Sequence, residues 1–194
     1  QERTHPFAMK SQFWLLDPRP NLPSIVKAVG DGFELSEASN TPVMLTVRIR
    51  ACHVTGIFET SDNKRPPLSV REALANPRKD FQRVVIPPWT YMHEKDKAEK
   101  RWPAAEKYIM EKKLNEVFGP DKADIGIVCQ GGMYNGVARA LQRIGLADIY
   151  GNTEVPIYCL NVTYPLVEKE FLKFCEGKPS VLVVEEGTPE FIEQ

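Results

Sequence analysis

Several features that would assign a function class directly are scarce in this sequence of 194 residues. Its 25 basic and 26 acidic residues give a formal net charge of −1. The chain therefore lacks the clustered excess of one sign that binds nucleic acid or a membrane surface. No apolar run approaches the roughly 18 residues of a membrane-spanning helix, and the first residues do not resemble a secretory signal. We expect a globular protein that binds neither nucleic acid nor membrane.

Cysteine is also scarce, with four residues at positions 52, 129, 159 and 175. No two of them form a C-x-x-C pair, so local spacing predicts neither a zinc site nor an iron–sulfur site. Four cysteines in a chain of this length do not indicate a disulfide framework either. Cys129 and Cys159 lie in apolar runs, where a buried free thiol is the usual role. The pattern predicts a reduced, cytoplasmic protein without a metal site of its own.

Proline, in contrast, is abundant, with 16 residues that concentrate in the first 90. The chain also begins with Gln1 rather than Met. A hydrophobic fraction of 42% is ordinary for a globular protein and is sufficient for a core. At roughly 150 residues per domain, these features predict a piece of a larger protein that holds one complete domain and the end of another.

The first part of the chain, residues 1–59, has the pattern of a helix followed by a buried strand. Ser24–Ala38 places small and apolar residues at helical spacing, and Val43–Ile49 is a β-rich apolar run. Arg50 and His53 follow that strand. They either line a ligand pocket, where a cation pairs with a carboxylate or phosphate, or fix the next segment through hydrogen bonds to its backbone.

Residues 60–101 are polar and rich in proline, with only weak periodicity. The pattern indicates a short helix at Val70–Ala75 and a short strand at Val84–Ile86. We interpret this part as a connector that crosses the surface of the protein.

Residues 102–194 alternate helical and strand patterns in the way typical of an α/β domain. In order, the pattern predicts a helix over Pro103–Phe118, a strand over Asp124–Cys129, a helix over Tyr134–Ile144, a strand over Val155–Asn161, a helix that opens at Tyr164-Pro165 and ends at Gly177, and a strand over Ser180–Glu185. Apolar strands joined by helices form parallel sheets with right-handed crossovers. Ligands of such sheets bind at the carboxyl ends of the strands.

The loops after these strands hold the candidate site residues. Gly131 and Gly132 would let backbone N–H groups approach an anion at a helix start, although a tight strand-to-helix turn explains them equally well. Tyr164 is either the wall of a ligand cleft or a packed aromatic residue at a helix start. Glu185 and Glu186 end the last strand, either as an acid–base pair or as a solvated strand end. The spacing indicates no catalytic set and no metal ligands.

Several stretches of the sequence resemble the large (alpha) subunit of the indolepyruvate:ferredoxin oxidoreductase family. Residues 35–56 read LSEASNTPVMLTVRIRACHVTG, in which Arg50, His53, Thr55 and Gly56 match the family's Arg-x-x-His before Thr-Gly. Residues 124–136 read DIGIVCQGGMYNG, residues 160–169 read LNVTYPLVEK, and residues 181–194 read VLVVEEGTPEFIEQ. The resemblance covers nearly the whole chain and is loosest between residues 60 and 123.

This resemblance implies both a domain arrangement and a reaction. Residues 1–59 would end a thiamine pyrimidine-binding domain, 60–101 would be a proline-rich connector, and 102–194 would form a transketolase C-terminal-like α/β domain. The family uses thiamine diphosphate and magnesium to convert aryl 2-oxo acids into acyl-CoA and CO₂, with iron–sulfur clusters and ferredoxin as electron acceptors. The implied partners are the remaining domains of the subunit, a beta subunit, ferredoxin and coenzyme A, in a dimer or hetero-oligomer.

The same resemblance implies that the chain is incomplete for catalysis alone. The acidic residue that engages the cofactor's pyrimidine ring is expected before Gln1, and the cluster cysteines are expected after Gln194. Two other functions stay open. One is a non-catalytic module for subunit assembly or ligand binding, and the other is a different α/β enzyme that uses the loop after Cys129.

Overall fold

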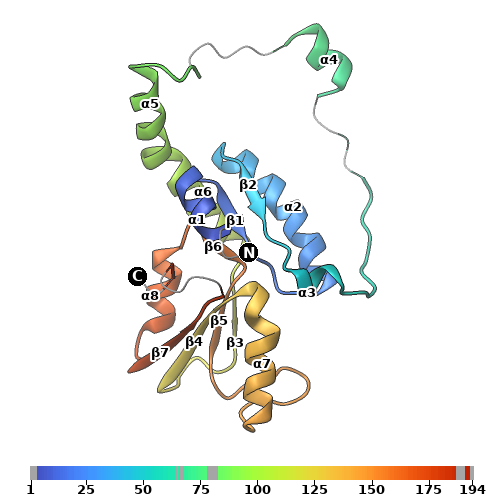
Figure 1. The fold of residues 1–194 in the computed structure, drawn as a ribbon, viewed down its shortest axis with the longest axis vertical. Coiled ribbons are helices and arrows are strands. Elements are labelled where there is room, and N and C mark those ends of the chain that lie inside the picture. The colour runs from blue at the N-terminus through green and yellow to red at the C-terminus, as the bar shows by residue number, and fades with distance from the viewer. Residues whose placement is uncertain (1–3, 64, 66–67, 78–82, 187–190, 193–194) are drawn as a thin grey trace.

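The computed structural model describes residues 4–63, 65, 68–77, 83–186 and 191–192, and it confirms the predicted α/β class (Figure 1). The helices are α1 (Thr4–Ser11), α2 (Leu22–Ser39), α3 (Ile49–Cys52), α4 (Val70–Ala75), α5 (Trp89–Asp96), a π-helix η1 (Lys97–Arg101), α6 (Trp102–Lys112), a 3-10 helix η2 (Gly131–Met133), α7 (Tyr134–Arg143) and α8 (Glu168–Cys175). The strands are β1 (Trp14–Leu16), β2 (Val43–Leu45), β3 (Glu116–Phe118), β4 (Ile125–Gln130), β5 (Ile157–Leu160), β6 (Val162–Tyr164) and β7 (Ser180–Val184).

The strands form two sheets, and one passage of the chain between them takes a single residue. The larger sheet has the order β3-β5-β4-β7 and the smaller one the order β2-β1-β6. In the larger sheet β4 runs parallel to β5 and β7, while β3 is antiparallel to β5. In the smaller sheet β1 runs parallel to β2 and antiparallel to β6. Asn161 separates β5 from β6, so the chain passes there from one sheet to the other.

Helices cover both faces of the larger sheet, with α7 on one side and α8 on the other (Figure 1). Val137 and Leu141 of α7 pack in one core cluster with Cys129 of β4. Phe174 of α8 packs in another cluster with Val128, the neighbouring residue of the same strand. Successive side chains of a strand point to opposite faces, so β4 must be apolar on both, as its continuous run predicts.

The smaller sheet packs against α2 and α6 around an aromatic cluster. Trp14 of β1, Leu35 of α2 and Ile109 of α6 belong to one buried core. The rings of Trp14 and Tyr164 each meet Trp102 edge to face, with both centroid distances 5.3 Å. Such edge-to-face pairs add to the energy gained from burial alone. The core therefore joins residues from the first 40 positions to residues beyond position 100.

The predicted helices α2, α4 and α7 are confirmed in place. The first is α2, which begins at Asn21, whose side chain accepts a hydrogen bond from the Ser24 N–H at 2.9 Å. It ends where Asn40 takes a left-handed conformation at φ 48°. The second is α4, which spans the predicted residues because Ser69 and Glu72 form a reciprocal capping box.

The helix predicted over Pro103–Phe118 is too long. It ends at Lys112 because Lys113 takes a left-handed conformation at φ 50°. Glu116–Phe118 is instead the strand β3, which pairs with the edge of β5. Helical periodicity is a local signal, whereas this strand depends on a partner about 40 residues away. The larger sheet is consequently mixed at this edge rather than wholly parallel.

Three other predicted elements differ from the structure. The strand predicted over Val43–Ile49 ends at Leu45 because its partner β1 ends at Leu16. The helix predicted to open at Tyr164 begins only at Glu168, since Tyr164 pairs with β1. Val84–Ile86 forms no strand. Each error has the same cause, because the presence or absence of a pairing partner is invisible in the local pattern.

The last part of the predicted connector is a packed helical segment. Residues of α5 and η1 continue directly into α6. In η1 the Lys97 ammonium donates hydrogen bonds to the Gln12 carbonyl at 2.7 Å and to Thr41 at 3.2 Å. It also lies 3.8 Å from the centroid of the Trp14 ring. Burial, helped by Arg101, lowers the pKa of Lys97 to about 8. The division of the chain into three domains stays a prediction.

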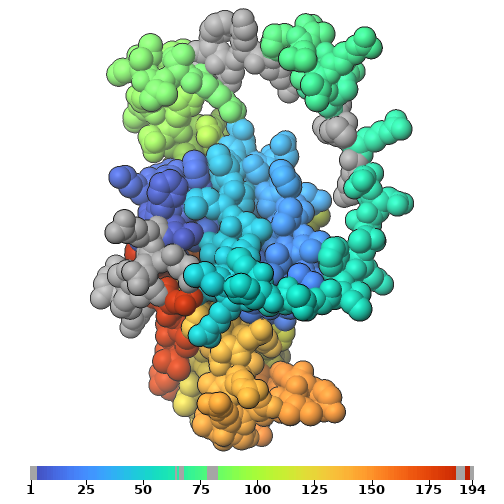
Figure 2. All heavy atoms as spheres, turned by 45° about the vertical axis from the view of Figure 1, so that its right-hand side comes forward, coloured from blue at the N-terminus to red at the C-terminus, as the bar shows by residue number. Residues whose placement is uncertain are grey.

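The α4 helix stands apart from both sheets, as both views of the molecule show (Figures 1 and 2). Its apolar residues Val70 and Leu74 are each 78% exposed. In the part of the chain that the structure describes, no helix combines the length and the apolar character needed to cross a membrane.

Candidate functional site

Polar side chains gather where the two sheets meet, near the carboxyl ends of β1, β4 and β7 and at the crossover between β5 and β6. We call this group the polar seam; it consists of Asp17, Arg19, Arg48, Glu116, Gln130, Asn161 and Glu186. Parallel strands bring their carboxyl ends to one edge of a sheet, which is where α/β proteins place their sites. The seam is therefore the candidate functional site of this chain.

Arg48 organises one half of the polar seam. Its Nε donates to Asp17 Oδ1 at 3.2 Å, and its Nη2 donates to Gln130 Oε1 at 2.7 Å. Its Nη1 forms an ion pair with Glu186. The Asp17 side chain is only 4% exposed. Burial raises the pKa of Asp17 even though Arg48 and the Gly132 N–H act to lower it. The contacts from Arg48 therefore favour the ionised form of this carboxylate, while burial opposes it.

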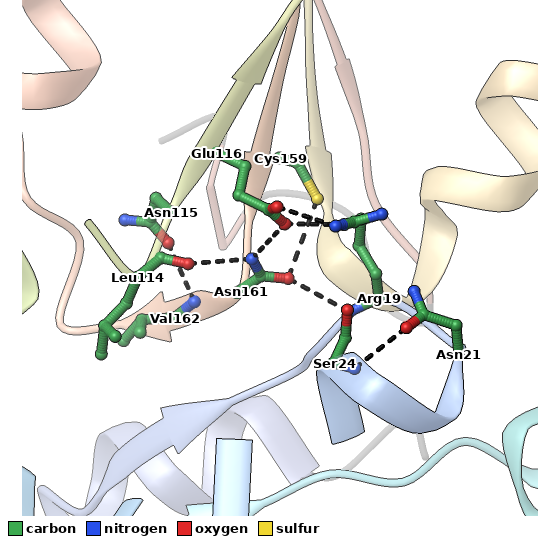
Figure 3. A network of polar contacts seen from close by, with 9 residues as sticks. All are labelled: Arg19, Asn21, Ser24, Leu114, Asn115, Glu116, Cys159, Asn161 and Val162. Atoms are coloured by element: carbon green, nitrogen blue, oxygen red, sulfur yellow. Dashed lines mark hydrogen bonds and ion pairs between the residues drawn. The ribbon is translucent and has the colours of Figure 1, made fainter. Parts of the chain in front are cut away.

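Arg19 organises the other half, shown in Figure 3. Its Nε and Nη2 donate to the two carboxylate oxygens of Glu116 at 2.6 and 2.7 Å, a bidentate pair. Asn161 Nδ2 donates to the same carboxylate at 2.8 Å, and Asn161 Oδ1 accepts from the Arg19 backbone N–H at 3.1 Å. The guanidinium carbon lies 5.1 Å from the Phe118 ring centroid and 5.2 Å from that of Tyr134. Both arginines of the seam are thus held by carboxylates of the same chain.

Glu116 should make the stability of the protein sensitive to acid. Burial opposes its ionisation, but hydrogen bonds from Arg19 and Asn161 outweigh burial and lower the pKa of Glu116 below its usual 4.5. A group with a lowered folded-state pKa stabilises the fold above its unfolded pKa, and this is lost as pH falls through the folded value. Urea titrations at pH 5 and pH 3 should show that this loss is smaller in Glu116→Gln. An equal loss in both proteins would contradict the assignment.

A pocket of about 210 Å³ opens beside the Arg19–Glu116 pair. Its lining includes Lys27 of α2 and Lys113, which directly follows α6. The Lys27–Asp31 ion pair, at 2.6 Å, and the Arg19–Glu116 pair each join opposite charges in this lining. Lys113 adds one further positive charge.

The five candidate residues named from the sequence separate into three places. Gly131 and Gly132 lie in the polar seam, where they pack against Asp17 and Arg48. Arg50 and His53 are exposed at α3, just beyond Arg48. Tyr164 packs in the aromatic cluster of the smaller sheet. Burial raises the pKa of Tyr164. The ligand-binding role of all five stays a prediction.

The two carboxylates predicted at the end of the last strand have different partners in the structure. Glu186 pairs with Arg48, while Glu185 Oε1 accepts a hydrogen bond from the Ile192 N–H at 2.8 Å. These contacts engage both carboxylates within the chain and do not arrange them as an acid–base pair.

The sequence reasoning missed the residues that organise the seam. Arg48 lies within the run that was predicted as a strand, and Asp17 and Arg19 lie on either side of Pro18, before the first predicted helix. The available signal was position, because Asp17 directly follows β1 and Gln130 is the last residue of β4. Both therefore lie at the carboxyl end of an apolar strand. Asn161 was predicted as the last residue of a strand and is instead the link between the sheets.

All four cysteines lie among the described residues and are free thiols, as expected. Cys129 and Cys159 face each other across β4 and β5 in the buried core. A hydrogen bond between the two thiols and their burial raise the pKa of Cys159 well above its usual range. Within the described ranges, no group of three or more His, Cys, Asp or Glu side chains is placed to hold a metal ion.

Residues 115–194, which contain β3 to β7 and four of the seven residues of the polar seam, match a known family described as the indolepyruvate oxidoreductase domain. They belong to that family. The match begins at the residue before β3 and includes Glu116, Gln130, Asn161 and Glu186. The resemblance stated from the sequence is therefore confirmed for this indolepyruvate oxidoreductase domain.

Curated relatives extend the similarity over most of the chain. The protein named indolepyruvate oxidoreductase subunit IorA from Methanothermobacter thermautotrophicus is 35% identical over 170 residues, which are 85% of this chain and 25% of the relative. The protein of the same name from Methanothermobacter marburgensis is 31% identical over 173 residues, 89% of this chain and 26% of the relative. The protein of the same name from Archaeoglobus fulgidus is 29% identical over 161 residues, which are 83% of this chain and 24% of the relative. The chain thus spans about a quarter of the length of these relatives.

Proposed function

We propose that this chain is part of a cytoplasmic, thiamine-diphosphate-dependent oxidoreductase that converts aryl 2-oxo acids of the indolepyruvate type into acyl-CoA and CO₂, with ferredoxin as electron acceptor. The observation that carries the proposal is the similarity of 85% of the chain to a protein named as an indolepyruvate oxidoreductase subunit. The relatives' name describes a subunit, which supports partners that include further domains of the same polypeptide and a beta subunit.

The described residues do not fit the magnesium diphosphate of the proposed cofactor. Magnesium prefers oxygen ligands and is usually held by carboxylates together with phosphate oxygens. No acidic cluster of the kind needed occurs among the residues that the structure describes, and the seam carboxylates Asp17, Glu116 and Glu186 are already paired with arginines. We therefore assign the cofactor to other domains of the enzyme.

Within that enzyme, the polar seam supports a positioning role for this chain. Its carboxylates and guanidinium groups are joined to one another, so they hold the two sheets together rather than face a substrate. Arg50 and His53 on α3 are exposed and extend directly from the seam. They are the residues of this chain that we propose to reach a phosphate or carboxylate on a neighbouring domain.

The proposed function is tested on the native complex, purified from the organism that produces it. An affinity tag on this chain allows its complex to be isolated without oxygen, and reduction of methyl viologen is then followed with coenzyme A, thiamine diphosphate and indolepyruvate. We expect indolepyruvate and phenylpyruvate to support dye reduction well above the rate with pyruvate. A purified complex that reduces no dye with any 2-oxo acid would refute the proposal.

The second candidate function, a non-catalytic assembly module, is favoured by the internal pairing of the seam charges. Replacing Arg50 and His53 together by alanine distinguishes the two. If they reach a ligand, the loss of charge-assisted hydrogen bonds should lower the rate of dye reduction by about 10-fold or more. The complex should still assemble, and Arg71→Ala on exposed α4 serves as the matched control. An unchanged rate would support the assembly role instead.

A further inference from the structure

A small cavity of about 30 Å³ lies between α1 and the polar seam. His5 of α1, Thr46 after β2 and Thr163 of β6 contribute to its lining, together with the seam residues Asp17, Arg48 and Gln130. These side chains therefore give the cavity a polar wall. It lies outside the pocket next to Arg19 and plays no part in the proposed reaction.

Two polar atoms on this cavity are buried without a hydrogen-bond partner. They are His5 Nδ1 and Thr46 Oγ1. The His5 residue is only 8% exposed, and its ring is fixed by stacking on Phe191 with a centroid distance of 5.0 Å. An unpaired buried polar atom loses its hydration without compensation, and native proteins satisfy nearly all such atoms with protein or ordered water. Two such unpaired atoms on one cavity indicate that a molecule able to form hydrogen bonds occupies it.

We propose that the cavity holds one ordered water molecule that bridges His5 Nδ1 and Thr46 Oγ1. The cavity of about 30 Å³ has room for a water molecule, and buried waters sit where two to four polar partners meet.

Water also matches the hydrogen-bonding character of the two orphan atoms. Burial lowers the pKa of His5 more than the nearby Glu185 raises it, which favours the neutral ring. A neutral imidazole nitrogen is either a donor or an acceptor, and a hydroxyl is both. Water serves every combination, whereas ammonium only donates. The cavity wall carries the Arg48 guanidinium together with the Asp17 and Glu186 carboxylates, so its lining holds charges of both signs.

The bridge would attach α1 to the polar seam. The water would join an N-terminal helix to the segment that follows β2, next to the Asp17–Arg48 pair. This connection positions the helix through a hydrogen-bonded water rather than through direct contact of the two side chains.

The sign of a stability change tests the proposal. Thr46→Val keeps the shape of the side chain but removes the hydroxyl. If a water bridges this hydroxyl, the melting temperature of the full chain should fall by about 2–6 °C, a common range for a lost hydrogen bond in a protein of this size. If the hydroxyl has no partner, valine should raise the melting temperature. Thr60→Val, at an exposed coil position, is the control and should leave it unchanged.

A direct observation of the water complements the melting experiment. Nuclear Overhauser contacts between water and the protons of residues 5 and 46 should be present in the native chain and in Thr46→Ser, and absent in Thr46→Val. Their absence in the native chain would overturn the proposal, as would a melting temperature of Thr46→Val at or above the native value. A melting temperature that changes between sodium and choline at equal ionic strength would assign the cavity to a cation instead.

Discussion

Replacing Arg48 by methionine is expected to lower the free energy of unfolding by about 3–5 kcal/mol, the usual effect of removing one partner of a buried ion pair. The variant leaves the Asp17 carboxylate, 4% exposed, and the Gln130 amide without their cation. Methionine fills a similar volume, so the loss of stability comes from the unpaired groups rather than from a cavity. Urea unfolding at pH 7, followed by circular dichroism, measures it.

Arg50 supplies the matched control for this experiment. It lies two residues further along the chain and is exposed on α3, so Arg50→Met should change the free energy of unfolding by no more than about 0.5 kcal/mol. The double variant Asp17→Asn with Arg48→Met should be more stable than the sum of the two single effects predicts, because the second change removes the unpaired charge. Equal effects of Arg48→Met and Arg50→Met would show that the seam does not stabilise the fold.

The second large effect is expected at Gly131. A β-carbon at this position would overlap the Asp17 carbonyl oxygen and would lie 2.8 Å from Asn161 Oδ1 and 3.1 Å from the Arg19 nitrogen. The obstruction includes backbone, which cannot move aside as a flexible side chain does. Gly131→Ala should therefore lower the free energy of unfolding by about 3 kcal/mol or more, at the upper end of the range for overpacked sites.

Gly136 provides the opposite expectation in the same measurement. It lies five residues further on in α7, where an added β-carbon meets nothing within 4 Å. Gly136→Ala should raise the free energy of unfolding by up to about 1 kcal/mol, because alanine favours the helix. Comparing the two variants thus distinguishes the effect of crowding between two chain segments from the general effect of replacing a glycine. A mild effect at both positions would contradict the packing of the seam.

The glycine comparison also refines the interpretation made from the sequence. Gly131 and Gly132 were expected either to approach an anion or to form a tight turn. In the structure a β-carbon at Gly131 is excluded by the Asp17–Arg19 segment, while one at Gly132 meets the Arg48 side chain. The glycines therefore let a second segment of the chain approach β4. Whether an anion also binds there stays a prediction.

Much of the larger sheet could be predicted from local pattern. The apolar runs gave β4 and β7, and helical spacing gave α2, α4 and α7, since each of these signals is contained within one element. The candidate site could be placed only approximately, at the strand ends. Its organising residues, Arg48 and Arg19, carry no local signal that distinguishes them from surface arginines.

By itself, then, the sequence determined the α/β class, the main helices and apolar strands, and the resemblance to the family, because these depend on residue types at short spacing. Only the tertiary structure decided that Glu116–Phe118 is a strand, that Asn161 links two sheets, and that Asp17 meets Arg48. These features arise between segments from 31 to more than 100 residues apart. Whether a strand pairs, or a charge is buried against its opposite, depends on a second segment that lies far away in the sequence. A local pattern therefore cannot predict these contacts.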